Sequence, residues 1–518
     1  MKTGSRKQKI ENILLLILVA VLVFSVGGAV YRMKETGRGQ EEMKLVLYEG
    51  PTSLKDATAD DIACAPESDR DITLKHCVDT KITVDGQECY VYDTNVNHTR
   101  CWVSNYKPPL SRTPIAYFDF EGRADIELTV PERDLSKVTV SPLSYGIKPV
   151  VDEKRHTVSF SIDTPDTYTV MFGDSPERAV HIFANPLETD VPDFNDENVI
   201  YIGPGEWDID AINLEDGQTL YLSGGAVVHG AVNANYAKNV TVMGRGIIDG
   251  SKLEGWMGQT AYIPLKFDHC ENVKLQDVIV LNANAWVCQG YDTKTAQLEG
   301  LKIVSARPNG DGITLQSCLD VEVKNCFVRS WDDSLVVKNY DGNTKNIQFS
   351  NIQVWTDFAQ SMEIGFETNK GQRENAAIMD VRFDNICVLH NFHKPVISVH
   401  NADDALVSDI IFQNIVVEDA QMGSGDGDEM PYLIDLCITQ NSNWSSTKER
   451  GRIENVLIDH VTVLSGKKCV SRIAGFDEEH KVSDVSISNL NILGEAITDF
   501  DAGQFEIDWD ATENLKIQ

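Results

Sequence analysis

The sequence predicts an all-β protein: a parallel β-helix with three strands per coil, preceded by a small β-sandwich and an N-terminal hydrophobic helix. Three observations predict it. A nine-residue strand pattern recurs in the C-terminal part of the chain, a strand-rich region without that repeat precedes it, and an apolar run lies near the N-terminus. We expect residues 1–34 to form the N-terminal segment, residues 44–190 the β-sandwich and residues 195–518 the β-helix.

The N-terminal segment is predicted to direct the protein to a membrane. Basic residues between Lys2 and Lys9 precede an unbroken apolar run from Ile13 to Val30. This run is long for the core of a signal peptide and just long enough to span a bilayer. We therefore favour an uncleaved anchor over a removed signal peptide. In either case the basic flank stays cytoplasmic, and the rest of the protein is exported, either tethered to the extracellular side of the membrane or secreted.

The region before the repeat contains strand patterns of a different kind. Runs such as 137–140 and 157–162 are rich in β-branched residues and are separated by Pro and Asp turns, which is typical of a β-sandwich. The evenly spaced cysteines here are Cys64, Cys77, Cys89 and Cys101. In an exported domain they are compatible with two disulfides, whose pairing the spacing does not determine. Later cysteines such as Cys326 and Cys387 fall within strand patterns, where we expect buried free thiols.

The repeat consists of Asn or Asp, two apolar residues at alternate positions, then a second Asn or Asp and two more apolar residues. Apolar positions two apart indicate a strand with one buried face. The extra residue between the halves indicates a bend, because Asn tolerates the left-handed conformation of a sharp corner. Clean copies begin at Asn272, Asp320, Asn346, Asp380, Asp409, Asn455 and Asp484. The bend residues are Asp277, Asn325, Asn351, Asn385, Asn414, His460 and Asn489.

A third strand follows each pair of strands. These third strands begin at Ile313, Leu335, Met362, Val396 and Leu433. Three strands per turn in a repeating unit describe a parallel β-helix. A β-sandwich would show alternating hairpin signals instead, and a propeller would show a more regular blade period.

Aligning the coils by their third strands brings acidic residues together. Asp311, Asp333, Gln360 and Lys394 each precede a third strand by two residues, so we expect a column with a spacing of about 4.8 Å per coil. Asp332 is adjacent to Asp333, and the glycines beside Asp311 would let a sugar approach it closely. A single Asp at a solenoid turn usually caps a loop, but three on stacked positions favour a functional site. At least one should keep a proton near neutral pH, as cleavage of a glycosidic bond requires.

Other residues near this column are candidates for substrate binding. Aromatic rings such as Trp331, Trp286, Trp355 and Tyr340 can stack on sugar faces, although each is equally suited to packing the protein. Lys338 ends the third strand of the catalytic coil, where it would contact a hydroxyl or neutralise the acidic column. The full set of substrate-binding candidates is Asn309, Trp331, Lys338, Gln360, Glu363, Lys394, His400 and Trp286.

The acidic residues also carry a family resemblance. Residues 309–312 (Asn-Gly-Asp-Gly), followed by Asp332 and Asp333, resemble the signature of glycoside hydrolase family 28, the polygalacturonases and their relatives. The resemblance covers about residues 195–495. It implies a right-handed β-helix and hydrolysis with inversion of the anomeric centre. It also implies that Asp332 is the general acid, while Asp311 and Asp333 hold and activate the water.

The sequence departs from the family pattern further along. Residues 359–361 (Ala-Gln-Ser) stand where the family has Gly-His-Gly, and the Arg-x-Lys that grips a uronate carboxylate is absent near residues 397–399. The N-terminal region, ending in residues 180–186, resembles the extra domain of family 49, the dextranases and isopullulanases. These features favour a neutral polysaccharide or oligosaccharide over polygalacturonate, although a pocket with Lys394 and His400 leaves an acidic sugar open.

Charge and composition exclude other classes of function. The formal net charge of −33 argues against nucleic acid as a partner and makes a polyanionic polymer a poor substrate. No Cys-x-x-Cys pair or His/Cys cluster has zinc spacing, and we expect no metal, no cofactor and a monomer. Two alternatives stay open: a β-helix polysaccharide lyase, which would need calcium and a basic catalyst, and a non-catalytic glycan-binding surface protein.

Overall fold

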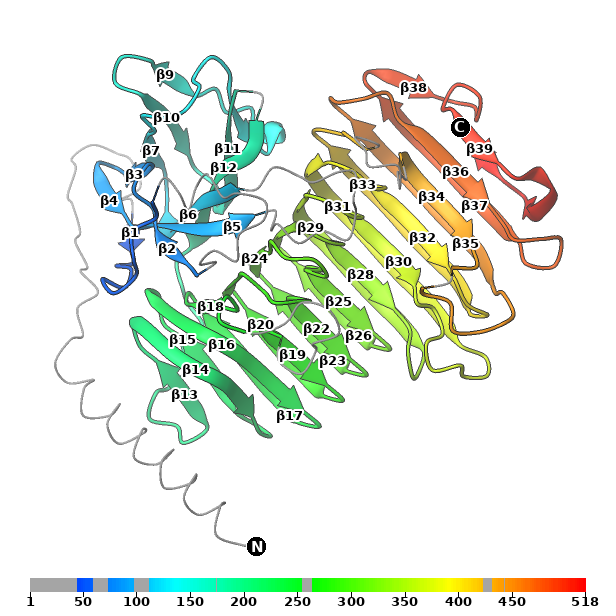
Figure 1. Ribbon diagram of the computed structural model, residues 1–518, viewed down its shortest axis with the longest axis horizontal. Helices are drawn as coiled ribbons and strands as arrows, with labels where there is room; N and C mark the ends of the chain where they lie inside the picture. Colours follow the sequence, from blue (N-terminus) through cyan, green and yellow to red (C-terminus); the bar gives the residue numbers. More distant parts are fainter. Residues whose placement is uncertain are drawn as a thin grey trace, which may run out of the picture.

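The computed structural model describes residues 44–58, 73–96, 111–173, 175–253, 263–422, 431–441 and 443–518. Within these ranges the protein is almost entirely β, with a long stack of strands and a smaller sandwich beside it (Figure 1). The helices there are single 3₁₀ turns, η1 (Leu143–Tyr145) and η2 (Trp509–Ala511), and no helix in the described part is long and apolar enough to cross a membrane. The hydrophobic helix expected in residues 1–34 lies outside the described residues, so the anchor stays a prediction.

The N-terminal region forms two packed sheets. The first sheet contains β1 (Lys44–Leu47), β2 (Lys75–His76), β5 (Val91–Val96), β6 (Ser111–Glu121), β8 (Val138–Ser141), β11 (Asp166–Phe172) and β12 (Ser175–Pro186). The second contains β3 (Lys81–Val84), β4 (Gln87–Cys89), β7 (Ala124–Thr129), β9 (Val150–Asp152) and β10 (Thr157–Ile162). Phe118 and Ile182 from the first sheet and Ile126 and Phe160 from the second are buried in one hydrophobic core, which is the arrangement of a β-sandwich.

The cysteines of the sandwich differ from the prediction. Cys77 and Cys89 are free and buried, so neither takes part in a disulfide as expected; Cys64 and Cys101 lie outside the described residues. The Cys77 thiol donates a hydrogen bond to Asp79 Oδ1 at 3.2 Å. Burial raises the pKa of Cys89 to about 12, which keeps that thiol protonated and unreactive.

The rest of the chain forms one continuous stack of strands in three rows. The first row runs through β13 (Val199–Ile202), β15 (Thr219–Leu222), β17 (Lys238–Gly244), β20 (Glu271–Gln276), β23 (Lys294–Glu299), β26 (Leu319–Lys324) and the first halves of β29 (Thr344–Thr356), β31 (Ala377–Asn391), β33 (Leu406–Val417), β35 (Arg452–Val463) and β37 (Val482–Ile492), and ends at β40 (Thr512–Glu513) and β41 (Lys516–Ile517). The second row runs through the first halves of β14 (Gly205–Leu214) and β16 (Ala226–Asn235), then β18 (Ile247–Asp249), β21 (Ile279–Leu281), β24 (Lys302–Val304), β27 (Phe327–Ser330) and the second halves of β29 to β37.

The third row carries the predicted site. It runs through the second halves of β14 and β16, then β19 (Leu265–Asp268), β22 (Cys288–Tyr291), β25 (Ile313–Gln316), β28 (Leu335–Lys338), β30 (Met362–Phe366), β32 (Ile397–Asn401), β34 (Tyr432–Ile438), β36 (Val470–Ala474) and β39 (Phe505–Ile507). Pairing within each row is parallel from coil to coil; only β38 (Glu495–Ile497) folds back antiparallel on β37. The predicted parallel β-helix with three strands per coil is confirmed.

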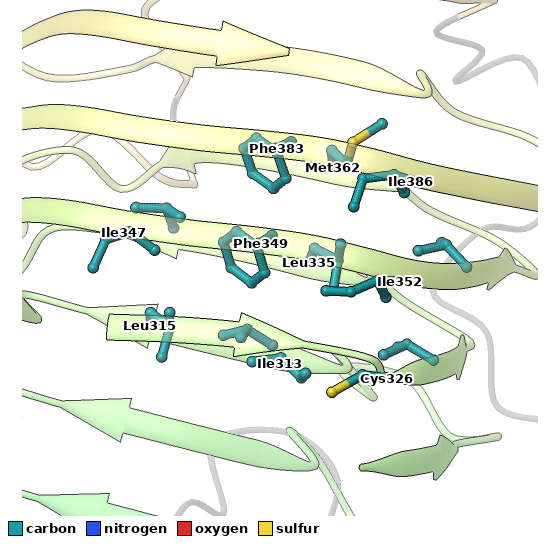
Figure 2. Close-up of a cluster of buried hydrophobic side chains, with 14 of the residues drawn as sticks. Ile313, Leu315, Cys326, Leu335, Ile347, Phe349, Ile352, Met362, Phe383 and Ile386 are labelled. Atoms are coloured by element: carbon teal, nitrogen blue, oxygen red, sulfur yellow. The ribbon is translucent and has the colours of Figure 1, made fainter. Parts of the chain in front are cut away.

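The coil corners and core follow the repeat. The bend residues adopt the left-handed conformation, with φ of 55° at Asn325, 54° at Asn351 and 55° at Asn385. Their amides form a ladder, because Asn385 Nδ2 donates to Asn351 Oδ1 at 2.8 Å. Inward side chains from successive coils stack on one another, as Figure 2 shows for Phe349 and Phe383, whose ring centroids are 4.8 Å apart with an interplanar angle of 3°.

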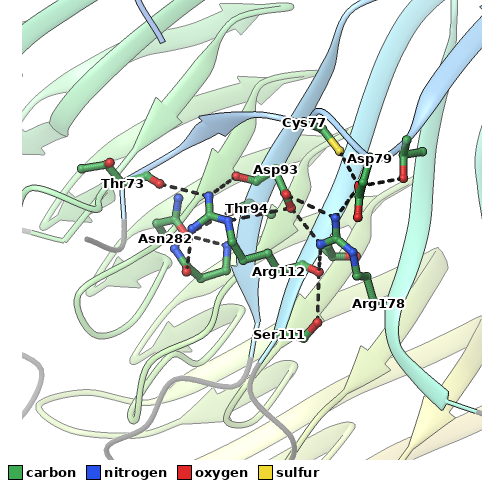
Figure 3. Close-up of polar contacts among 12 residues, drawn as sticks. Thr73, Cys77, Asp79, Asp93, Thr94, Ser111, Arg112, Arg178 and Asn282 are labelled. Carbon is green, nitrogen blue, oxygen red and sulfur yellow. Dashed lines mark hydrogen bonds and ion pairs between the residues drawn. The ribbon is translucent and has the colours of Figure 1, made fainter. Parts of the chain in front are cut away.

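Buried polar contacts join the sandwich to the β-helix. Arg178 on β12 holds Asp93 on β5 at 3.2 Å and Asp79 at 2.6 Å (Figure 3). The next residue on β5, Thr94, donates its hydroxyl hydrogen to Asn282 Oδ1 of the β-helix at 3.0 Å. Because buried polar groups are costly when unpaired, these contacts fix how the two parts meet.

A second contact supports the coil that carries the acidic pair. Arg329, at the end of β27, binds Asp357 at 3.0 Å and lies over the Trp355 ring at 4.6 Å. Its Nη1 donates to His181 Nε2 of the sandwich at 3.2 Å. Burial, together with the charge of Arg329, keeps the pKa of His181 well below its usual range, so this imidazole is neutral and can accept the bond. The sandwich thus holds the strand that leads directly to Asp332.

Candidate active site

The three predicted aspartates lie together at the entry to the third strands. Ile313 pairs with Leu335, and the Gly312 N–H donates to Asp333 O at 2.8 Å, so Asp311 and Asp333 occupy equivalent positions on neighbouring coils. Asp311 is 3% exposed, and Asp332 and Asp333 are 8% exposed. All three interact electrostatically with one another. The predicted acidic cluster therefore exists as a compact, mostly buried group.

The column around these aspartates differs from the prediction at one position. Gln360 joins it, since the Ser334 N–H donates to Gln360 O at 2.9 Å. On the next coil Met362 pairs with Ile397 rather than with Val396, so Pro395 takes the place predicted for Lys394. Lys394 nevertheless lies close enough to favour the ionised form of Asp332.

Backbone N–H groups orient two of the carboxylates. Asp332 accepts hydrogen bonds from the Asn309 N–H at 3.2 Å and the Asp333 N–H at 3.0 Å, and Asp333 accepts one from the Gln360 N–H at 2.9 Å. Asn309 has a φ of 57°, a left-handed conformation that Asn tolerates. Asn309 and Gln360 therefore contribute through the backbone, where sequence reasoning considered their side chains.

The glycines beside Asp311 serve the packing of the chain. A Cβ on Gly310 would lie 2.6 Å from Arg307 O, and one on Gly312 would lie 2.5 Å from Ser334 O. Both positions face protein rather than an open cleft, which corrects the expectation that these glycines make room for a sugar.

Lys338 neutralises part of the cluster. Its Nζ lies 2.9 Å from Glu367 Oε2, 4.0 Å from Asp311 Oδ2 and 5.7 Å from the centre of the Trp286 ring. The Tyr340 hydroxyl also donates to Glu367, at 3.1 Å. Burial opposes the ionisation of Glu367, but Lys338 outweighs it and lowers the pKa of that carboxyl. Glu367 stands in a loop after β30, where no repeat or motif marks it, and sequence reasoning missed it.

Burial controls the protonation of the three aspartates. Burial and then the charge of Asp332 raise the pKa of both Asp311 and Asp333 well above their usual range. Burial also raises the pKa of Asp332 to about 6, against the opposing effects of Lys338 and the Asp333 N–H. The site therefore holds protons near neutral pH, in agreement with the expectation from three crowded carboxyls.

A chain of alternating charges extends from the cluster along the third row. Glu363 lies near Asp333 and raises its pKa. His400 Nδ1 is 2.9 Å from both Glu363 oxygens, and its Nε2 is 3.0 Å from Asp435 Oδ2. Arg472 completes the chain with bonds of 2.8 and 2.7 Å to Asp435. Burial opposes the ionisation of His400, but the two carboxylates outweigh it and raise its pKa to about 10.

Residues 220–503 match the family model described as glycosyl hydrolases family 28. The chain belongs to this family. It is 22% identical over 130 residues to a probable polygalacturonase from Vitis vinifera, covering 23% of this chain and 25% of the relative. It is 23% identical over 117 residues to a polygalacturonase from Chamaecyparis obtusa, covering 20% of this chain and 23% of that protein. The matched segments span about a quarter of the curated relatives' length.

The fold of this family 28 protein resembles that of Dex49A from Penicillium minioluteum. The TM-score is 0.62 at 15% identity, and the match covers 94% of this chain and 100% of Dex49A. At this identity the likeness concerns the fold alone. Since it includes both the sandwich and the β-helix, it agrees with the likeness to family 49 seen in the N-terminal sequence.

Three of the predicted substrate-binding residues of this family 28 protein have other roles in the structure. Trp331 is fully buried and stacks on Phe358 with ring centroids 4.5 Å apart, so it packs the coil instead of presenting a face to a sugar. Glu363 and His400 are also fully buried and bind each other, so neither ring nitrogen of His400 is left for a sugar carboxylate. Trp286 and Lys338 remain at the edge of the acidic cluster.

Proposed function

We propose that this family 28 protein hydrolyses O-glycosidic bonds of a polysaccharide or oligosaccharide with inversion, using Asp332 as general acid and Asp311 and Asp333 to hold and activate water. The observation that supports this proposal best is the position of Asp311 and Asp333 at equivalent sites on neighbouring coils, with Asp332 directly adjacent to Asp333 in the chain. A proton donor and a water-activating carboxylate on one site are the two groups that inverting hydrolysis needs.

In this mechanism each group has a defined task. Asp332 gives its proton to the glycosidic oxygen as the bond to the anomeric carbon breaks. A water held by Asp311 and Asp333 attacks that carbon from the opposite face and passes its proton to whichever of the two is ionised, a form that the charge of Lys338 favours at both. Lys338, 4.0 Å from Asp311, offsets the negative charge that remains.

The hydrogen bonds to Asp332 bear on its role as the acid. The N–H groups of Asn309 and Asp333 favour its carboxylate form in the free site. A glycosidic oxygen, in contrast, accepts a hydrogen bond only from the protonated form, so substrate binding would raise the pKa of Asp332 further. Asp332 is then protonated when the substrate is bound.

The charges around the site support a neutral substrate. The His400 cation lies between Glu363 and Asp435, and the Lys338 ammonium lies against Glu367. These pairs engage His400 and Lys338, so neither is left for a uronate carboxylate, and the net charge of −33 repels polyanions. We therefore propose a neutral glycan as substrate.

A glycan panel tests the proposed function. We expect the purified full chain to release reducing ends from at least one neutral glycan and none from polygalacturonate, with the product formed in the inverted anomeric configuration. The same activity should persist in a metal chelator. Loss in chelator together with unsaturated sugar products would indicate a lyase, and absence of cleavage across the panel would leave a binding protein.

The pH profile gives a second test. The acid must be protonated, so kcat/KM should fall as the pH rises through the pKa of Asp332, which is about 6 in the free protein. We expect the highest kcat/KM on the acidic side of neutrality and a tenfold fall per pH unit on the alkaline limb. An alkaline limb that begins well above pH 8 would contradict this assignment.

A further inference from the structure

A row of aromatic rings runs along the C-terminal edge of the third strands toward the site. Tyr236 and His269 stack at 4.6 Å, His269 and Tyr291 meet edge to face at 5.5 Å, and Tyr291 and Tyr340 do so at 6.0 Å. Their strands β16, β19 and β22 follow one another in the stack, and β28 comes two coils after β22, with β25 between them (Figure 1). The exposed fraction falls from 74% at Tyr236 to 31% for the side chain of His269, while Tyr291 and Tyr340 are half-buried.

The inner end of the row is continuous with the acidic cluster. The Tyr340 hydroxyl donates to Glu367, whose carboxylate binds Lys338, and Lys338 lies 4.0 Å from Asp311. The outer end lies in solvent at Tyr236. Aromatic rings that become more exposed with distance from a glycoside hydrolase site are arranged as a track into that site.

The backbone indicates that Tyr236 is not placed there for the fold. Tyr236 and His269 occupy corners with φ of 55°, a left-handed conformation that is unfavourable for a bulky side chain. Elsewhere in this solenoid such corners mostly carry Asn or Asp, as at Asn325 and Asn351, and exceptions such as Ser317 and His460 are not tyrosines. An aromatic side chain at this position, 74% exposed, costs backbone energy and gains little burial.

We propose that Tyr236, His269, Tyr291 and Tyr340 form a binding track for the glycan chain outside the catalytic site, on the N-terminal side of Asp311. The inference rests on the proposed function, since it takes the occupant to be the same polysaccharide. Sugar rings present apolar faces that pack on aromatic rings. Asp268 is paired with Lys266, but Asp292 contacts the His269 ring at 3.2 Å and Asp341 binds the Tyr291 hydroxyl, so the track is acidic and the glycan it takes is a neutral one.

Retention of the full chain in gels containing soluble neutral glycans tests the track. All proteins carry Asp332→Asn so that the glycan stays intact, and dextran, soluble starch and xyloglucan serve as probes. Tyr236→Asn should weaken retention by the best-binding glycan about tenfold, and Tyr236→Phe should retain it. Because Asn suits the left-handed corner, Tyr236→Asn should not lower the melting temperature. A ring kept for packing would give the reverse result, lower stability with unchanged retention.

Trp509→Ala removes another exposed aromatic ring, 64% exposed on the last coil, and should leave retention unchanged. Equal retention of Tyr236→Asn and its parent, or no retention by any neutral glycan, would overturn the track. Failure of the track with cleavage in the glycan panel leaves the proposed function standing. Retention that depends on Tyr236 without any cleavage supports the track and refutes the hydrolase mechanism.

Discussion

Asp332→Asn is expected to lower kcat on the natural glycan at least about a hundredfold, the usual scale for loss of one acid–base group. The amide keeps the size of the side chain, and its single oxygen can still accept one of the two hydrogen bonds that the Asn309 and Asp333 N–H groups donate to Asp332. It cannot give a proton to the leaving oxygen. Initial rates of reducing-end release, with the purified full chain and a glycan identified by the panel, measure the loss.

A change of leaving group separates the acid from the water-activating residues. An aryl glycoside with an acidic phenol needs little protonation, so Asp332→Asn should lose far less activity on it than on the natural glycan. Asp311→Asn should lose similar activity on both, because the attack of water is still impaired. Asp320→Asn, at an exposed corner, serves as the matched control and should be fully active. A loss below tenfold for Asp332→Asn on the natural glycan would refute the acid assignment.

The fold could be predicted because its signals are local. Alternating apolar residues and an Asn at each corner are fixed by the strand period and by one backbone conformation, and Asn351 and Asn385 adopt that conformation as expected. The error at Lys394 has a physical cause. Val396 and Ile397 are both apolar and both fully buried, so the sequence alternation could not decide which of them pairs with Met362.

The site could be predicted only where the repeat itself positions the residues. Asp311 and Asp333 are one coil apart, and the register brings them together. The exposure of Trp331 depends instead on Phe358, which comes from the loop before the next third strand. The role of Glu367 depends on Lys338, which reaches it across neighbouring coils. Such contacts between loops have no period in the sequence.

His400→Gln is expected to lower the free energy of unfolding by about 3 to 5 kcal/mol near pH 6, the scale for breaking a buried ion pair. The substitution leaves Glu363 without the cation that lies 2.9 Å from it, in a fully buried position. The pKa of His400 is raised from 6.5 to about 10 in the folded protein, so its contribution to stability is fully present below pH 6.5 and is lost as the pH rises through 10. Denaturant unfolding of both proteins at several pH values measures the difference.

The contribution of the ion pair can be tested by removing Glu363, the partner of His400, as well. The double variant Glu363→Gln/His400→Gln should be more stable than His400→Gln alone, because no unpaired carboxylate is then buried. His460→Gln is the matched control: this imidazole is 60% exposed and bonds to Asp459 on the surface, so its removal should cost less than about 1 kcal/mol. If the loss from His400→Gln is equally large near pH 6 and pH 10, packing and not charge makes His400 important. The double variant would then be no more stable than the single one.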